Sequence, residues 1–166
     1  MTWRLPPESR VKPVTAGKGA TIFYNDSTSG EKFVIMNNRF LENRRYGVLL
    51  QSHDGLVAGN YFAGTSGNAI LLMNTMHSGS GFIPYNIVIR NNCFVGCYTQ
   101  KIVKRGAAHA GVVASLVEKA GYRKAPEDLI ENISIRMNYF LSTDRVPALR
   151  MQNTINLDVG GNILRH

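Results

Sequence analysis

Two arginines, Arg90 and Arg136, occupy equivalent positions in two copies of a repeated segment, and both are predicted to point outward from one face. Two guanidinium groups on one face can grip a carboxylate, a sulfate or a phosphate through paired hydrogen bonds. The alternative is that both are surface arginines lying along a sheet. They are therefore candidates for binding an anionic ligand.

The histidines give one further candidate, His77, which lies in a segment rich in glycine and serine. His53, His77 and His109 are far apart in the sequence and lack neighbouring ligands, so no metal site is predicted. No glycine-rich phosphate loop, nucleophile elbow or Ser/His/Asp order is visible. We accordingly predict no cofactor, and the catalytic residues stay unknown.

An internal repeat carries these residues and decides the expected fold. Apolar residues alternate up to an asparagine, and a bulky apolar residue follows two positions later. The five segments are FVIMNNRF, GLVAGNYF, IVIRNNCF, ISIRMNYF and LDVGGNIL, and their aligned asparagines are Asn38, Asn60, Asn92, Asn138 and Asn162.

Alternation with a period of two predicts strands with one buried face. A second apolar run follows the asparagine by about ten residues in the first repeats, so each turn of chain supplies at least two strands and a corner. The sequence predicts an all-β protein, a right-handed parallel β-helix of about five coils. The asparagines are expected to form a structural ladder, because stacked amides can satisfy buried backbone groups at tight corners.

Two segments interrupt the repeat within a β-helix domain expected over 21–166. Residues 107–121 have helix-like spacing and end on a glycine, which predicts an inserted α-helix within the insertion 104–128. The insertion 74–85 is expected to be an exposed loop. Residues 1–20 are expected to form an N-terminal arm or the remnant of an earlier coil.

The order of elements NNRF, GVLLQ, GNYF, SGNAILL and NIVIRNNCF, within residues 33–97, resembles the C-terminal coils of the α-1,3-galactosidases of glycoside hydrolase family 110, which are pectin-lyase-like β-helix proteins. The resemblance implies inverting hydrolysis of a terminal α-linked galactose by a secreted or periplasmic enzyme. In that family the key acids sit in an Asp-Asp motif, which this chain lacks. No catalytic residue is therefore carried over.

Four residues near the GVLLQ element, where the likeness is best, are candidates for binding a sugar: Arg44, Arg45, Tyr46 and Gln51. A sugar face can stack on the tyrosine while arginine and glutamine donate hydrogen bonds to hydroxyl groups. The alternative is a charged turn beside a packed strand.

We therefore expect a carbohydrate-associated β-helix, part of a glycoside hydrolase of the α-galactosidase type and not active alone. The alternatives are a non-catalytic glycan-binding or assembly β-helix, resembling a surface or tail-spike protein, and, less favoured, a polysaccharide lyase. The expected partner is a carbohydrate, either an α-galactoside or an anionic glycan. A homo-oligomer, or missing upstream coils, is expected to cover the ends of so short a stack.

The amino-acid composition limits the classes of molecule that are expected to bind this protein. The net charge of +8 over 166 residues favours anionic partners, but the basic residues are scattered and no nucleic-acid-binding motif is present, so nucleic acid is not the expected partner. No apolar stretch is long enough to span a bilayer, and the first twenty residues lack the apolar middle of a signal peptide.

The cysteines Cys93 and Cys97 are expected to be free thiols or to form one short bridge.

Overall fold

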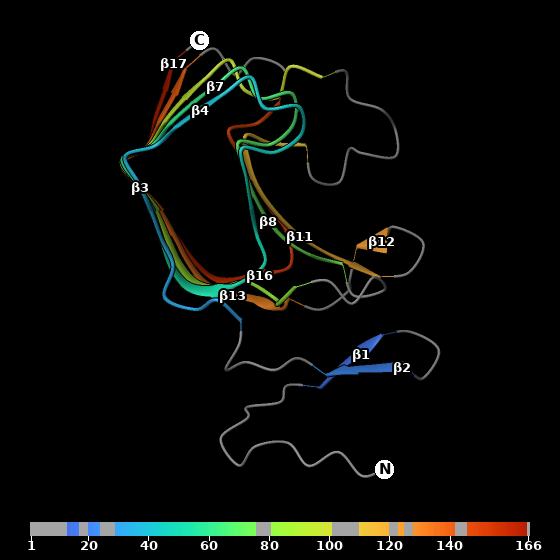
Figure 1. Ribbon diagram of the computed structural model, residues 1–166. Coiled ribbons are helices and arrows are strands. Elements are labelled where there is room, and N and C mark those ends of the chain that lie inside the picture. Colours follow the sequence, from blue (N-terminus) through green and yellow to red (C-terminus); the bar gives the residue numbers. More distant parts are fainter. Residues whose placement is uncertain are drawn as a thin grey trace.

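The computed structural model describes residues 13–16, 20–23, 29–75, 81–100, 110–119, 123–124, 128–141 and 146–165. Over these ranges the regular structure consists of strands alone, and most of them lie in three parallel sheets around a common interior (Figure 1). This arrangement is consistent with a parallel β-helix. The described ranges accordingly hold no helix that could cross a membrane.

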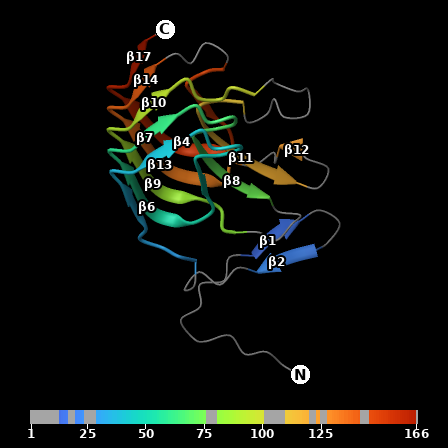
Figure 2. The same cartoon turned by 45° about the horizontal axis from the view of Figure 1, so that its top comes forward.

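The strand before each ladder asparagine belongs to the first sheet, which has five parallel strands. These strands are β3 (Val34–Met36), β6 (His53–Ala58), β9 (Tyr85–Arg90), β13 (Ile130–Arg136) and β16 (Thr154–Gly160). They stack in the order of the sequence (Figure 2). Equivalent inward positions pair directly, as in Val57 with Ile89 and Ile89 with Ile135, so the register predicted from the repeat is confirmed.

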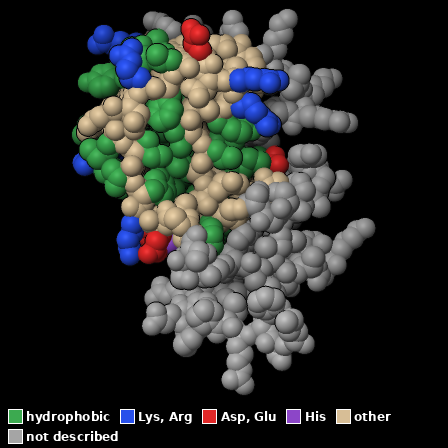
Figure 3. All heavy atoms as spheres, in the orientation of Figure 1, with side chains coloured by type: hydrophobic (Ala, Val, Ile, Leu, Met, Phe, Trp, Pro, Cys, Tyr) green, Lys and Arg blue, Asp and Glu red, His purple; other side chains and the backbone are tan. Residues whose placement is uncertain are grey.

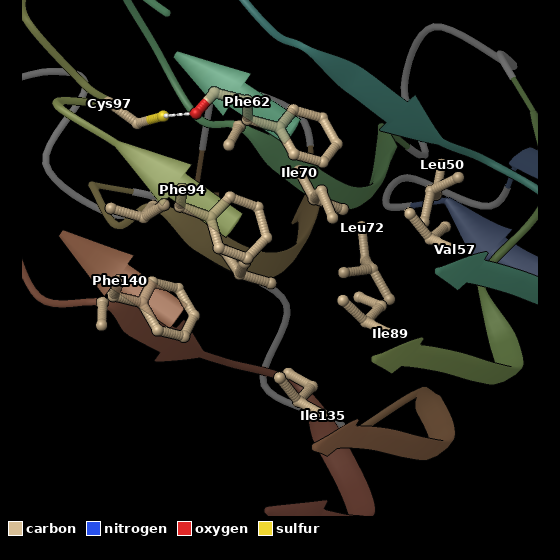
Figure 4. Packing of buried hydrophobic residues seen from close by; sticks show 14 of the residues in the cluster. Leu50, Val57, Phe62, Ile70, Leu72, Ile89, Phe94, Cys97, Ile135 and Phe140 are labelled. Atoms are coloured by element: carbon tan, nitrogen blue, oxygen red, sulfur yellow. Dashed lines mark hydrogen bonds between the residues drawn. The ribbon is translucent and has the colours of Figure 1, made fainter. Parts of the chain in front are cut away.

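The strand after each ladder asparagine belongs to the second sheet, which also has five parallel strands. They are β4 (Arg39–Leu41), β7 (Tyr61–Ala63), β10 (Cys93–Val95), β14 (Tyr139–Leu141) and β17 (Ile163–Arg165). The central residue is a phenylalanine in the first four of these strands. The rings stack, with centroids 4.7 Å apart for Phe40 and Phe62, 5.1 Å for Phe62 and Phe94, and 4.8 Å for Phe94 and Phe140. Figure 4 shows Phe62, Phe94 and Phe140 pointing into the interior.

The third sheet contains the second apolar run of the first, second and fourth repeats, whereas the third repeat contributes Val113–Lys119, which begins 21 residues after Asn92. Its strands are β5 (Val48–Leu50), β8 (Ile70–Thr75), β11 (Val113–Lys119), β12 (Arg123–Lys124) and β15 (Leu149–Met151). All pair in parallel except β12, which is antiparallel to β11. A separate antiparallel pair is formed by β1 (Pro13–Ala16) and β2 (Ala20–Phe23).

The α-helix predicted over 107–121 is wrong: Val113–Lys119 is strand β11, paired with β8 on one side and β15 on the other. Residues 112–117 are all fully buried, so both faces of the strand are covered. A short run that is apolar on both faces has no period-2 alternation and cannot be told from a buried helix by pattern. Three valines within six residues, Val112, Val113 and Val117, favour the strand.

The other predicted insertion falls partly on described residues. Asn74 and Thr75 belong to β8, residues 81–84 have no regular structure, and Tyr85 begins β9. Residues 76–80 lie outside the described part of the chain.

The core fills the space between the sheets, and it is covered least at the ends of the stack. Ile89, Phe94 and Phe140 are fully buried, whereas Leu164, which is equivalent to the two phenylalanines in the last turn, is 55% exposed. Figure 3 views the molecule in the orientation of Figure 1, and hydrophobic side chains lie in the middle of the surface that faces the viewer.

Both cysteines are free, and the thiol of the buried Cys97 donates a hydrogen bond to the carbonyl of Phe62 (Figure 4).

The predicted asparagine ladder is confirmed. The amide oxygen of Asn92 accepts from the backbone N–H and the side-chain amide of Asn60, at 2.9 and 3.0 Å. Asn92 donates in the same way to Asn138, and its side-chain amide also reaches the carbonyl of Val57. Asn38 and Asn162 extend the ladder at its two ends. Each asparagine thereby satisfies corner groups of neighbouring turns, which holds the turns in register.

We predict that Asn92→Ala lowers the free energy of unfolding by about 3 kcal/mol or more. The truncation leaves two donors of Asn60 and the carbonyl of Val57 without their partner in the interior, and each such group costs about 1–3 kcal/mol. Chemical denaturation measures the change. Asn38→Ala, at the exposed end of the same ladder, is the matched control and should cost less than about 1 kcal/mol. Equal losses in the two variants would contradict the ladder's role in the interior.

Candidate functional site

The predicted arginine pair is adjacent in the structure. Arg90 on β9 and Arg136 on β13 are direct register partners on the outward face of the first sheet, and both are exposed. Arg136 binds Asp158 through two hydrogen bonds, from Nε to Oδ2 and from Nη2 to Oδ1. This bond lowers the pKa of Asp158 and raises the pKa of Arg136. An anionic ligand at this place would have to share Arg136 with Asp158.

The residues near the GVLLQ element lie around β5. Arg44, Arg45 and Tyr46 form the corner before this strand, and Gln51 follows it. The guanidinium carbon of Arg45 lies 5.5 Å from the ring centroid of Tyr46, so these two side chains are in contact. The Arg45 carbonyl accepts the N–H of Gly67 at 2.7 Å, and the Gln51 carbonyl accepts the N–H of Phe82 at 2.9 Å. The backbone of both segments therefore helps to join neighbouring turns.

His77, the histidine candidate from the sequence, lies outside the described residues.

A second line of outward residues, not predicted as a site, runs across the second sheet. Arg39, Tyr61, Cys93, Tyr139 and Ile163 are successive register partners across β4, β7, β10, β14 and β17. The guanidinium carbon of Arg39 lies 5.0 Å from the ring centroid of Tyr61. The sequence signal for this line is the residue directly after each ladder asparagine.

A third group, also not predicted, joins a hydroxyl, an imidazole and a carboxylate. The Oγ atom of Ser29 lies 2.6 Å from Nε2 of His53, and Nδ1 of His53 lies 2.7 Å from Oδ2 of Asp54. The three side chains come from the segment before β3 and from the first two residues of β6. His53 and Asp54 are adjacent in the sequence, but Ser29 lies 24 residues before His53, and no local pattern indicates that this serine meets the histidine.

The imidazole of His53 is held on several sides. Its ring stacks on Tyr85 with centroids 4.3 Å apart and meets the edge of Phe82 at 6.0 Å. Only 1% of the His53 surface is exposed, whereas Ser29 is half-buried. The ring is therefore fixed in position beside a serine that is partly accessible.

Asp54 is the first member of a second polar ladder. Asn86 donates to Asp54, Asn132 donates to Asn86, and Asn156 donates to Asn132, at 2.8, 2.8 and 3.1 Å. All four residues have φ between 51° and 55°, a left-handed conformation that Asp and Asn tolerate better than other non-glycine residues. The sequence signal is an Asp or Asn six residues before the ladder asparagine, in four of five repeats. The hydrogen bond from Asn86, followed by the bond to His53, lowers the pKa of Asp54.

Glu31 completes a cluster with His53 and Asp54, in which one ligand atom from each lies within 4.8 Å of the others. Glu31 is also paired with Lys32 at 3.1 Å. Inverting glycoside hydrolysis needs two carboxyl groups about 6.5–9.5 Å apart. The Glu31 and Asp54 oxygens are closer than this, so this pair does not have the separation that the inverting reaction needs.

Comparison with known proteins leaves the family open. No protein-family model matches the chain, and a search of curated proteins finds no match. The resemblance of residues 33–97 to the α-1,3-galactosidases therefore stays a proposal.

We predict that Asp54→Asn flattens the acid limb of the stability curve. The pKa of Asp54 in the folded protein is lower than its ordinary value of 3.8, so the carboxylate stabilises the fold above that value. This contribution is lost as the pH falls below about 3.8 and through the folded-state pKa. Urea denaturation from pH 7 to pH 2 measures it, with the exposed Asp128→Asn as the control. An unchanged pH dependence in Asp54→Asn would contradict the stabilising role of these hydrogen bonds.

Proposed function

We propose that this protein is a carbohydrate-associated parallel β-helix that binds a glycan on the outward face of its second sheet. The observation that carries the proposal is the pair of outward tyrosines, Tyr61 and Tyr139, which lie on one line across that sheet. An aromatic ring offers a flat apolar surface to the C–H face of a sugar, and the tyrosine hydroxyl adds a polar group at its edge.

The spacing of this line suits an extended ligand. Tyr61 and Tyr139 lie on β7 and β14, which are separated by the single strand β10. Two strand spacings correspond to about 9–10 Å. The residue between them is Cys93, whose small side chain leaves the two rings as the prominent groups on this line. Two rings at this separation can support alternate units of one glycan chain.

Arg39 adds polar contacts at one end of the line. Its guanidinium group lies over the ring of Tyr61, where it presents several N–H donors beside the aromatic surface. A sugar on the face of Tyr61 that Arg39 leaves open can place hydroxyl groups at the ring edge, where they accept these hydrogen bonds. The combination of a ring and a fork of donors resembles the one expected for Tyr46 and Arg45, but here it lies on a strand instead of at a corner.

The finer proposal concerns the sugar and the reaction. The likeness of residues 33–97 to the α-1,3-galactosidases supports a terminal α-galactoside as the ligand and a secreted or periplasmic location. The missing Asp-Asp motif supports binding without turnover by this chain alone. An assembly role remains the alternative to glycan binding.

A second candidate ligand is an anionic glycan at the first sheet. It is favoured by the adjacency of Arg90 and Arg136 and by the net charge of +8. Among the described residues, Arg90 forms no ion pair, so its charge is available to a carboxylate or a sulfate.

We predict that Tyr139→Ala weakens glycan binding by at least about 10-fold, which corresponds to about 1.4 kcal/mol. Tyr139 is 49% exposed, so its removal takes away contact surface without opening the core. A glycan array containing terminal α-1,3-galactose and anionic polysaccharides identifies the ligand, and calorimetric titration measures the affinity. Val34→Ala is the control, because Val34 is exposed on the outward face of the first sheet.

Three outcomes would contradict the proposal. The first is unchanged affinity in Tyr139→Ala, and the second is no binding to any glycan on the array. The third is binding to anionic polymers alone that Arg90→Ala abolishes, which would establish the arginine pair as the site. Measuring released galactose in the same samples tests separately whether the chain turns over an α-galactoside.

A further inference from the structure

We propose that Ser29, His53 and Asp54 form a nucleophilic triad that hydrolyses carboxylic esters. The Ser29–His53 and His53–Asp54 distances of 2.6 and 2.7 Å fall within the range of about 2.6–3.2 Å expected for a nucleophile, its base and the group that orients the base. The atoms follow the order that such chemistry needs: hydroxyl to Nε2, and Nδ1 to carboxylate. This proposal stands independently of glycan binding.

The base is preorganised from two directions. Asp54 binds Nδ1 of His53 through one carboxylate oxygen, while Asn86 donates to the other oxygen at 2.8 Å. Asn132 and Asn156 continue this ladder along the stack, so the carboxylate is anchored to the first sheet. The ring of Tyr85 lies parallel to the imidazole at 4.3 Å. The histidine is thus held in the orientation in which Nε2 faces the serine.

The nucleophile lies at a bend whose backbone is held in place. The hydroxyl of Ser52 donates to the carbonyl of Ser29 at 2.7 Å and to that of Gly30 at 3.0 Å. Gly30 has φ of 68°, so the chain turns directly after the serine. Ser29 itself is half-buried, so part of this residue is exposed.

The reaction follows from these positions. Oγ of Ser29 attacks the ester carbonyl carbon while Nε2 of His53 takes the hydroxyl proton, and Asp54 stabilises the imidazolium that forms. The bond from carbon to the alcohol oxygen then breaks, and His53 returns the proton to the leaving alcohol. Water attacks the acyl-serine with His53 again accepting the proton, and the acid leaves as the serine hydroxyl is restored. One ester and one water yield one acid and one alcohol.

A divalent cation held by Glu31, His53 and Asp54 is the competing interpretation of the same residues. Both ring nitrogens of His53 already take part in hydrogen bonds, one to Ser29 and one to Asp54. A metal bound to His53 must displace one of these partners, whereas the triad uses both contacts as they stand. The geometry therefore favours the triad.

The test uses a fluorophosphonate probe and p-nitrophenyl acetate on the full chain. We expect the probe to attach to Ser29, as located by peptide mass spectrometry. We also expect Ser29→Ala to abolish labelling and to lower the rate of ester hydrolysis by about 100-fold or more. Ser134→Ala is the matched control, because this serine lies on β13, away from the triad, and should leave labelling and rate unchanged. Circular dichroism confirms that each variant retains its strands.

Asp54→Asn gives a second, independent measurement, since it keeps the size of the side chain and removes the charge that orients His53. We expect its rate to fall by about 100-fold or more. Labelling at another residue, no labelling of the parent protein, or an unchanged rate in Ser29→Ala would each overturn the proposal. Hydrolysis that is lost on adding a chelator and is unaffected by Ser29→Ala would overturn it in favour of the cation site.

Discussion

The hydrogen bond from the backbone N–H of one ladder asparagine to the amide oxygen of the next is the interaction on which the rest of the structure depends. It joins the corner between the first and second sheets in every turn, and the side-chain amides of Asn60, Asn92 and Asn138 also reach backbone carbonyls of the preceding turns. Because side chains in a strand alternate between faces, a slip of one residue would send the core outward. The ladder therefore fixes which residues are buried and which are displayed.

This register creates columns of equivalent residues on the outward faces. One column brings together the arginines of β9 and β13, and another places the tyrosines of β7 and β14 on one line. Neither group of residues is close in sequence. Each group is brought together only because strands of successive turns lie next to one another.

The second ladder shows how a structural device and a chemical group can share residues. Its members adopt left-handed conformations at the start of the first-sheet strands and pass hydrogen bonds along the stack. In the turn containing β6 the member is an aspartate, preceded by a histidine that contacts Ser29. The ladder thereby positions a charged group beside an imidazole, and the proposed chemistry depends on that position.

The sequence by itself determined the strands on either side of the ladder asparagines, their register and the asparagine ladder, because a repeat places the same apolar positions in every turn and the pattern is local. It also placed Arg90 and Arg136 on one face. It failed at Val113–Lys119, where burial on both faces removes the alternation that distinguishes a strand. It also missed Ser29, His53 and Asp54, since the contact between the hydroxyl and the imidazole joins residues 24 positions apart. Only the tertiary structure, in which one turn lies on the next, decided that contact.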